Sequence, residues 1–327
     1  MTRTAILCFD DCHASSLSGF ADLLQVANAH LQQQGMAATQ FKWDFVSSTG
    51  QVAAASNGLP IPTEKFGPRK RYELVFIPSL HYRGQRALDR FLAQQQLACD
   101  WLTAQRRHGA VLVANCTGTF LLAQTGLLDG RAATTTWWLE QQFRNRFPRV
   151  DLQLQRMLTE EDGLLCAGPA ASYLLQAVRA VELFKGQGVA AQCAKSMLLD
   201  LTQTALTPYL PLLAGSEHGD ALVQRAQRWL SRYMSREVRI AELAAELATS
   251  ERTLIRRFKA ALNITPLAYL QDLRLEAARA LLEGADLRIE QIAAQVGYAD
   301  TSSFARLFKQ RVGVSPGQYR ARFQLPR

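Results

Sequence analysis

The sequence lacks the features of membrane and secreted proteins. Its 327 residues contain no apolar run near the roughly 18 residues that span a bilayer. Asp10 and Asp11 interrupt the apolar N-terminus before a secretion signal could form. We therefore expect a soluble, unprocessed, cytoplasmic chain without membrane partners.

Cysteine is sparse and is not paired in the sequence. The six cysteines form no Cys-x-x-Cys motif, which fits a reduced compartment better than a disulfide framework. Cys8, Cys12 and His13 lie close together, but Cys8 falls in an expected buried strand and no second pair of ligands follows, as a zinc site would require. We expect neither a metal nor a cofactor.

Acidic residues are fewer than basic ones, chiefly in the last third of the chain. The net charge is +9. From Glu217 onward there are 18 Lys and Arg and 12 Asp and Glu, so about two thirds of the excess positive charge lies there. This distribution suits a polyanionic partner, although charge alone also fits a solvated basic surface.

The first 200 residues alternate strand-like and helix-like segments, which predicts an α/β domain with a mostly parallel, flavodoxin-like sheet covered on both faces. The expected strands are Thr4–Phe9, Trp43–Ser47, Leu74–Ile77, Val111–Ala114, and a hairpin of Leu152–Leu158 and Leu164–Cys166 that turns at Asp162-Gly163. The expected helices are Ser18–Gln34, Ala87–Arg107, Thr119–Ala123, Trp137–Phe147, Ala170–Lys185 and Val189–Leu201.

A segment rich in proline and glycine separates this region from an all-helical remainder. Thr207–Asp220 has little periodicity and is typical of a linker. We therefore expect three parts: an α/β domain over 1–206, a linker over 207–219, and an all-α domain over 220–327.

The all-α part contains one helix-turn-helix pattern twice. LAAELATSERTLIRRFKAALNITPLAYL begins at Leu243, and IAAQVGYADTSSFARLFKQRVGVSPGQYR begins at Ile292. Phe258 and Phe308 are 50 residues apart, whereas the two starts are 49 apart, so the second turn holds one additional residue. Two such units, at about 239–263 and 288–313, suggest that two successive stretches of DNA groove are read.

Each unit has an apolar back and a polar front. In the first, Ser250 should cap a helix that buries Leu254, Phe258 and Leu262. In the second, Phe304, Phe308 and Val312 face the core. The continuous helix expected over Pro266–Glu283 would hold the units at a fixed separation. A generic helical bundle with charged faces is the alternative interpretation.

This region, roughly Asp220–Phe323, resembles the AraC/XylS family of transcriptional regulators, most specifically in GYADTSSFARLFKQRVGVSPGQYR. The resemblance implies a protein that binds double-stranded DNA, usually an activator, with RNA polymerase as a partner. By position, the base-reading residues would be Arg252, Arg256, Ser302, Ser303 and Arg306, beside the outward-facing Thr253 and Thr301. The phosphate contacts would be Arg257, Lys259, Lys309 and Arg320.

In the N-terminal part, the segment Asn115-Cys116-Thr117-Gly118 follows an expected strand, as in a nucleophile elbow. VLVANCTGTFLLAQTGLLDGRAATTTWW resembles the class-I glutamine amidotransferase-like proteins of the PfpI/ThiJ type. Together with an AraC-type domain it is similar to the GlxA-like regulators. That group includes sensors of amino acids and quaternary amines.

The sequence departs from the catalytic pattern of that group. Thr136 stands where a histidine often precedes Trp137, and Ser79-Leu80 replaces a glycine pair that places backbone donors. Only the acid position, Asp22, fits. A cysteine without a base lacks what nucleophilic catalysis needs. His13 or His81 could substitute, but no spacing argument brings either one to Cys116.

We therefore expect no catalytic residues, and a ligand pocket at the carboxyl ends of the strands. Its expected residues are Asp22, Ser79, Cys116, Thr117, Thr136 and Trp137. Trp138 is expected to be a helix-packing residue rather than a ligand contact. The leading hypothesis is a homodimeric regulator controlled by a small metabolite. The alternatives are a cysteine hydrolase or glyoxalase-like enzyme with an accessory DNA-binding domain, and a DNA-binding protein without an effector.

Overall fold

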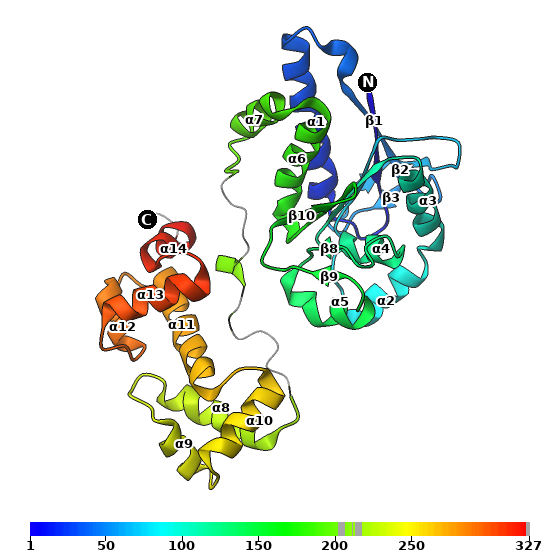
Figure 1. Ribbon diagram of the computed structural model, residues 1–327. Coiled ribbons are helices and arrows are strands. Elements are labelled where there is room, and N and C mark those ends of the chain that lie inside the picture. Colours follow the sequence, from blue (N-terminus) through cyan, green and yellow to red (C-terminus); the bar gives the residue numbers. More distant parts are fainter. Residues whose placement is uncertain (202–206, 211, 213–217, 325–327) are drawn as a thin grey trace. The chain divides into compact units, whose positions relative to one another are not determined.

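The N-terminal segments fold into a seven-stranded sheet between two layers of helices (Figure 1). The computed structural model describes residues 1–201, 207–210, 212 and 218–324. The strand order is β10-β11-β7-β6-β1-β2-β5, and the β10–β11 pair alone is antiparallel within this described sheet. The order β2-β1-β6-β7-β11 is that of flavodoxin-like sheets. The predicted α/β fold is confirmed, with an antiparallel pair at one edge.

The strands are short and deeply buried at the centre of the sheet. They are β1 (Thr2–Leu7), β2 (Phe41–Ser47), β5 (Glu64–Lys65), β6 (Leu74–Ile77), β7 (Val111–Asn115), β10 (Leu158–Glu161) and β11 (Leu164–Ala167). Two further pairs lie outside the sheet: β3 (Ala53–Ala54) with β4 (Pro60–Ile61), and β8 (Ala132–Ala133) with β9 (Asp151–Leu152). All four residues of β6 are fully buried, as an apolar run in a parallel sheet predicts.

Helices cover both faces of the sheet (Figure 1). One layer holds α1 (Ala14–Gln33), α6 (Tyr173–Lys185) and α7 (Gln187–Ser196), which pack on one another. The other holds α2 (Gln85–Ala93), α3 (Gln96–Arg107) and α4 (Gly118–Gln124). The 3-10 turns of residues 1–201 are η1 (Ala37–Thr39), η2 (Trp137–Leu139), which precedes α5 (Glu140–Arg146), and η3 (Ala170–Ser172), which precedes α6; a fourth, η4 (Thr207–Tyr209), follows later in the chain.

Several predicted elements have different bounds in the structure, and three of them differ most. The helix predicted over Ala87–Arg107 is two helices, because the chain closes α2 with a tight turn in which Gln95 N–H bonds to the Leu92 carbonyl at 3.1 Å. The predicted strand over Leu152–Leu158 is reduced to β9 and the first residue of β10. The predicted helix over Val189–Leu201 ends at Ser196. The hairpin turn at Asp162-Gly163 is confirmed, with φ of 47° and 66°.

The C-terminal segments form seven helices within the described residues. They are α8 (Ala221–Tyr233), α9 (Ile240–Glu246), α10 (Glu251–Leu262), α11 (Pro266–Gly284), α12 (Ile289–Gln295), α13 (Thr301–Val312) and α14 (Pro316–Phe323). The predicted continuous helix is confirmed in α11. Its first half, with Leu270, belongs to a core built on α8–α10, and its second half, with Leu275 and Leu282, belongs to a core built on α12–α14.

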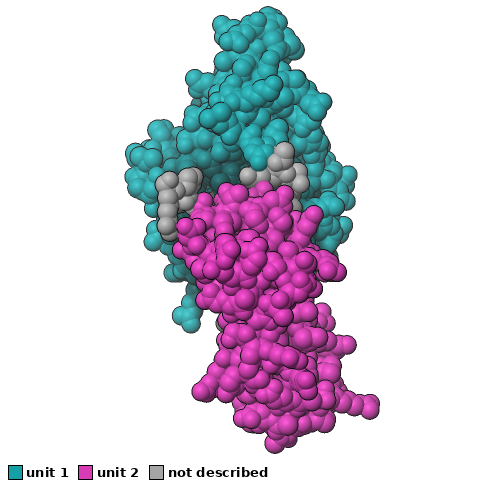
Figure 2. Space-filling model, turned by 90° about the vertical axis from the view of Figure 1, so that its left-hand side faces the viewer, with its two compact units in different colours: residues 1–206 teal, residues 207–327 magenta. Residues whose placement is uncertain are grey.

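The chain divides into two compact units, residues 1–206 and 207–327 (Figure 2). Part of the expected linker, residues 211 and 213–217, lies outside the described residues. The part before it packs on the second unit: Arg279 donates to the carbonyls of Pro208, at 2.5 Å, and Leu210, at 2.7 Å, and Tyr209 lies against Phe323. No described helix combines the length and apolar character that crossing a membrane demands.

Candidate nucleic-acid interface and the elbow of the N-terminal unit

The two predicted recognition helices, α10 and α13, each begin at a side-chain cap. The Ser250 hydroxyl accepts the Thr253 N–H at 3.2 Å, which confirms the predicted cap. In the second helix-turn-helix unit, the Asp300 carboxylate accepts hydrogen bonds from the N–H groups of Ser302, at 3.2 Å, and Ser303, at 2.8 Å. A hydrogen bond from the Ser303 side chain, and then these backbone bonds from Ser303 and Ser302, hold the pKa of the Asp300 carboxyl below its usual range. Each helix is therefore held at the end that would enter a groove.

The turn before each recognition helix requires a left-handed backbone. Ala248 occupies this position in the first unit with φ of 51°, and Gly297 occupies it in the second with φ of 92°. A Cβ atom on Gly297 would lie 2.6 Å from the Met234 carbonyl oxygen, so only glycine fits there without a shift of the backbone.

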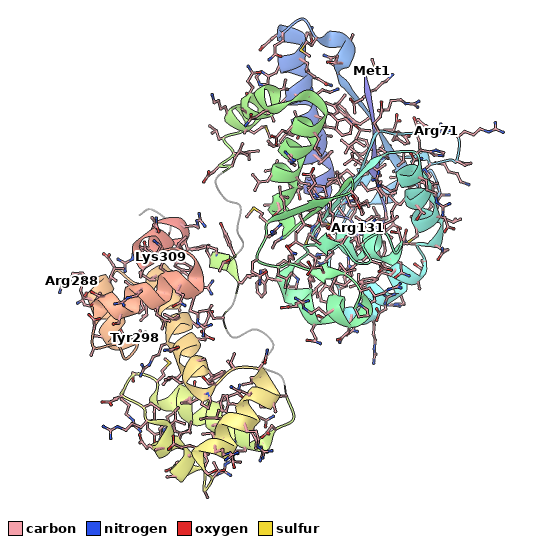
Figure 3. The ribbon with its side chains drawn as sticks, in the orientation of Figure 1. Met1, Arg71, Arg131, Arg288, Tyr298 and Lys309 are labelled. Atoms are coloured by element: carbon pink, nitrogen blue, oxygen red, sulfur yellow. The ribbon has the colours of Figure 1, made fainter. Side chains whose placement is uncertain are left out.

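The faces of both helices divide as predicted, except that Leu262 is half-buried rather than buried. Leu254 and Phe258, and likewise Phe304 and Phe308, are fully buried. Most of the predicted DNA contacts are exposed on the opposite face: Arg252, Arg256, Lys259, Ser302, Ser303, Arg306 and Lys309, with Thr253 and Thr301 half-buried beside them. Figure 3 marks Lys309 on α13. This arrangement leaves each helix free to present donors to base edges and phosphates.

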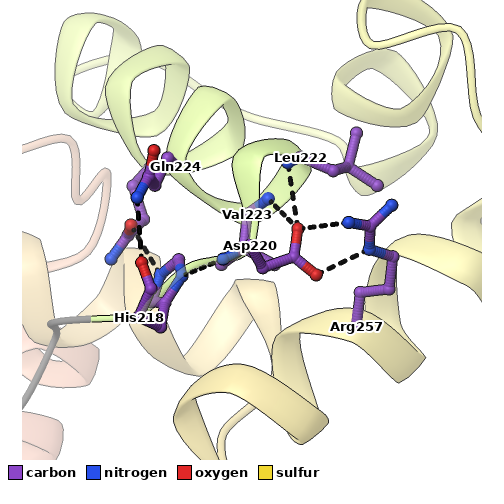
Figure 4. Close-up of polar contacts among 7 residues, drawn as sticks. His218, Asp220, Leu222, Val223, Gln224 and Arg257 are labelled. Carbon is purple, nitrogen blue, oxygen red and sulfur yellow. Dashed lines mark hydrogen bonds and ion pairs between the residues drawn. The ribbon is translucent and has the colours of Figure 1, made fainter.

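Arg257 has an intramolecular partner that the sequence did not suggest (Figure 4). Its Nε and Nη2 atoms donate to the two carboxylate oxygens of Asp220 at 2.7 and 2.6 Å. Asp220 also caps α8 by accepting the N–H groups of Leu222 and Val223. The Arg257 hydrogen bonds are the main cause of the lowered pKa of Asp220. A phosphate contact by Arg257 would have to compete with this carboxylate.

Arg320 is likewise engaged within the domain. It is half-buried and donates from Nη2 to the Leu287 carbonyl at 2.5 Å. Its contact with phosphate stays a prediction.

Arg274, on the shared helix α11, ties the two helix-turn-helix units together. Its Nε donates to the Met234 carbonyl at 2.7 Å and its Nη2 to the Arg236 carbonyl at 2.6 Å, both in the segment that leads from α8 into the first helix-turn-helix unit. Its guanidinium also lies 5.3 Å from the ring centroid of Tyr298, in the second unit. The two recognition helices are therefore fixed relative to each other by α11 and by this contact.

The predicted elbow in the N-terminal unit is present. Cys116 has φ of 53° between β7 and α4 and is 2% exposed. Its N–H bonds to the Ala167 carbonyl at 2.9 Å, and its carbonyl accepts from the Thr135 hydroxyl at 2.7 Å. Gly118 packs against the end of β6, where a Cβ atom would collide with the Pro78 carbonyl. The strained turn is thus held tightly from both sides.

The elbow binds the loop after β6 through one hydroxyl. Thr117 Oγ1 accepts the Leu80 N–H at 2.6 Å and donates to the Leu80 carbonyl at 2.8 Å. In acyl-transfer enzymes, backbone N–H groups at such an elbow point at the substrate oxygen. Here the N–H groups of Leu80 and Cys116 are both bonded within the protein, so neither is free to do so.

The expected ligand-pocket residues do not form one open group. Ser79, Thr117 and Thr136 are buried with Cys116, whereas Asp22 is exposed on α1. Asp22 lies near Tyr173 of α6. Burial raises the pKa of Tyr173, and the negative charge of Asp22 raises it further.

The two tryptophans after Thr136 lie against each other. Trp137 is half-buried, and its ring centroid is 5.3 Å from that of Trp138. Trp138 packs on Trp137 but is 46% exposed, so it is not part of the buried core.

Two histidines lie together near Ser79. The ring centroids of His13 and His81 are 5.7 Å apart, and His13 Nδ1 is 3.0 Å from Ser79 Oγ. Burial, and then the neighbouring His81, lower the pKa of His13. Among the described residues, no group of three or more His, Cys, Asp or Glu side chains is placed to hold a metal.

Sequence comparisons identify the C-terminal unit and relate the whole chain to known regulators. The Helix-turn-helix domain family matches residues 243–322. The HTH-type transcriptional regulator CdhR of Pseudomonas aeruginosa is 30% identical over 287 residues, which cover 86% of this chain and 82% of CdhR. The chain belongs to the AraC-type family of HTH-type transcriptional regulators. It is also similar to the regulator GbdR of Pseudomonas aeruginosa, 24% identical over 95% of this chain and 82% of that protein.

The N-terminal unit of this AraC-type regulator is similar in fold to several solved structures. Drosophila melanogaster DJ-1beta matches 61% of the chain and 98% of its own length, with a TM-score of 0.51 and 16% identity. A Vibrio parahaemolyticus protein matches 61% of the chain and 99% of its own length, with a TM-score of 0.52 and 18% identity. At these identities the likeness concerns the fold alone.

Proposed function

We propose that this regulator acts as a transcriptional activator, in the cytoplasm, in response to a small metabolite bound by its N-terminal unit. The observation that carries the proposal is the pair of capped, polar-faced recognition helices joined rigidly by α11, attached to a DJ-1-like unit in which the N–H groups of Leu80 and Cys116 are bonded within the protein. An effector would act by binding one arrangement of the DNA-binding units more tightly than another.

We further propose that the protein works as a homodimer that contacts RNA polymerase at the promoter. The different surfaces of α10 and α13 support a target of two unlike half-sites for each protomer. In the first helix-turn-helix unit, the guanidinium groups of Arg252 and Arg256 would contact base edges. In the second, the contacts would come mainly from the hydroxyls of Ser302 and Ser303, with one guanidinium, that of Arg306. Sequencing of selected binding sites should then yield an asymmetric direct pair.

Replacing Arg306 by alanine should weaken binding by about 1–3 kcal/mol and relax the base preference at one position. Lys309→Ala, on the same helix, is the matched control: it should weaken all sequences alike and lower the salt dependence by about one unit of slope. Titrations of full and single-base-variant sites at several salt concentrations measure both. An unchanged sequence preference in Arg306→Ala would refute its role as a base reader.

The Cys116→Ala variant should keep its effector response and its DNA affinity. The thiol is buried and the nearby backbone donors at Leu80 and Cys116 are occupied, so we propose that Cys116 supports the fold rather than reacting. The enzyme hypothesis predicts turnover of amides or dicarbonyls by the native chain that disappears in this variant. Detection of such turnover would favour the enzyme.

We also propose that the buried residues Ser79, Thr117 and Thr136 shape the effector region, with Asp22 and Trp137 at its margins. Thr117 supports this role most directly, because its hydroxyl fixes the backbone of Leu80 in the loop after β6. Asp22 and Trp137 are included in this proposal only because of their positions in the sequence.

A further inference from the structure

A short basic loop leads into β6 in the N-terminal unit. Residues 67–71 read Gly-Pro-Arg-Lys-Arg and lie at the edge of the sheet where β1, β2 and β6 begin. The residues on either side of the loop rest on Trp101 of α3. The Phe66 ring stacks on the Trp101 ring with centroids 4.7 Å apart, and the Tyr72 ring meets it edge-on at 6.1 Å. Both ends of the loop are therefore fixed on one helix.

The backbone of the loop is also held on both sides of Arg71. The buried Gln105 side chain donates to the Lys70 carbonyl at 2.9 Å and accepts the Tyr72 N–H at 3.0 Å. Arg69 and Arg71 are exposed, and Figure 3 marks Arg71 on this loop. Because the backbone is held, the two guanidinium groups are presented to solvent from a fixed base, which lowers the ordering cost of binding a partner.

Two further cations lie beside the loop. Arg3 on β1 and Lys42 on β2 are paired in register, so their exposed side chains leave the same face of the sheet on strands about 4.8 Å apart. The Arg3 guanidinium and the Lys70 ammonium each lie 5.8 Å from the centroid of the Tyr72 ring. Strands and loop thus form one basic patch, which consists of Arg3, Lys42, Arg69, Lys70 and Arg71.

The basic patch holds more positive charge than the neighbouring acids neutralise. Lys70 pairs with both Asp44 and Glu64, each at 2.9 Å, and Glu73 accepts the Arg3 N–H at 2.6 Å. Within the described residues, the other four cations of the patch form no ion pair, whereas six other arginines of the unit do: Arg83, Arg131, Arg144, Arg146, Arg149 and Arg179. The patch is therefore left to bind an anion from outside the chain.

We propose that the basic patch binds the phosphate backbone of double-stranded DNA outside the bases that α10 and α13 read. Guanidinium groups match phosphate oxygens through planar, two-pronged hydrogen bonds. The helix-turn-helix units already hold DNA, which raises the concentration of duplex near the patch. Contacts to phosphate add affinity without adding base preference. Such a contact is separate from the proposed effector control and does not depend on it.

The test compares the full-length native chain with the double variant Arg69→Gln/Arg71→Gln on two duplexes. One is a selected binding site of about 20 base pairs, and the other carries the same site between random flanks of about 30 base pairs each. On the long duplex the variant should bind about tenfold more weakly at low salt, and the slope of log affinity against log salt should fall by about two. On the short duplex both proteins should bind alike, which also shows that the C-terminal unit is intact.

The matched control, Arg86→Gln/Lys195→Gln, removes the same charge from two exposed residues of α2 and α7 outside the basic patch. It should bind both duplexes as the native chain does, and thermal unfolding of the N-terminal unit should be unchanged in both double variants. An equal loss of affinity in the two would assign the effect to net charge and overturn the patch. Native affinity and salt slope of the patch variant on the long duplex would overturn it as well. Should vesicles of phosphatidylcholine and phosphatidylserine then retain only the native chain, the patch would belong to an anionic membrane instead.

Discussion

Replacing Gly297 by alanine should lower the free energy of unfolding of the C-terminal unit by about 2–4 kcal/mol. Two costs combine: a left-handed backbone at φ of 92°, and a Cβ atom 2.6 Å from the Met234 carbonyl oxygen. That carbonyl also accepts from Arg274, which joins the two helix-turn-helix units. DNA binding should therefore weaken even where the variant remains folded, because the recognition helices would be displaced relative to each other.

The repeat supplies a matched control in the equivalent turn. Ala248→Gly should change the free energy of unfolding by less than about 1 kcal/mol, because relief of the left-handed backbone offsets the greater freedom of glycine in the unfolded chain. Calorimetry of the full-length chain, following the transition of the C-terminal unit, measures both variants. Equal effects at the two positions would show that the contact with Met234 does not constrain the turn.

Replacing Arg279 by methionine should destabilise the same unit by about 3–5 kcal/mol. Arg279 is 6% exposed and donates to the Tyr319 hydroxyl at 2.9 Å and to Glu276 at 2.8 Å, besides the carbonyls of Pro208 and Leu210. Methionine fills much of the volume but donates nothing, so these acceptors lose their partner. Hydrogen exchange should then accelerate at Leu212, whose N–H bonds to Glu276 at 2.6 Å.

Arg322→Met is the control for this substitution. Arg322 is exposed and lies 5.9 Å from the centroid of the Tyr209 ring, so its loss should cost about 1 kcal/mol or less. A similar loss of stability in both variants would mean that the buried network at Arg279 does not anchor the segment before α8. The expected difference instead makes residues 207–210 a structural part of the DNA-binding unit.

Much of this architecture could be predicted from the sequence, because its signals are local. Leu74–Ile77 is an apolar run whose bounds match β6, and Ser250 precedes a helix whose buried stripe repeats every four residues. The division between α2 and α3 could not be predicted in this way. Gln94–Gln96 contains neither glycine nor proline, so the break depends on tertiary packing rather than on local propensity.

The interactions that the sequence did not indicate join distant positions. Arg257 and Asp220 are 37 residues apart, and Arg279 reaches a carbonyl 71 residues away. The basic patch is formed by two strands and a loop, so no motif in the sequence marks its full extent. The elbow was predicted because Cys116 and its neighbours are contiguous, whereas its connection to Leu80 depends on the order of β6 and β7 in the sheet.

The two separate cores of the DNA-binding unit have an evolutionary consequence. They share α11 but bury different residues of it, Leu270 on one side and Leu275, Ala278 and Leu282 on the other. We expect a substitution inside one core, away from Arg274 and Gly297, to disturb the other core less, so that the two copies of the motif can change separately. If the two recognition helices read separate half-sites, as we propose, one copy could change its DNA preference while the other still holds the protein on DNA.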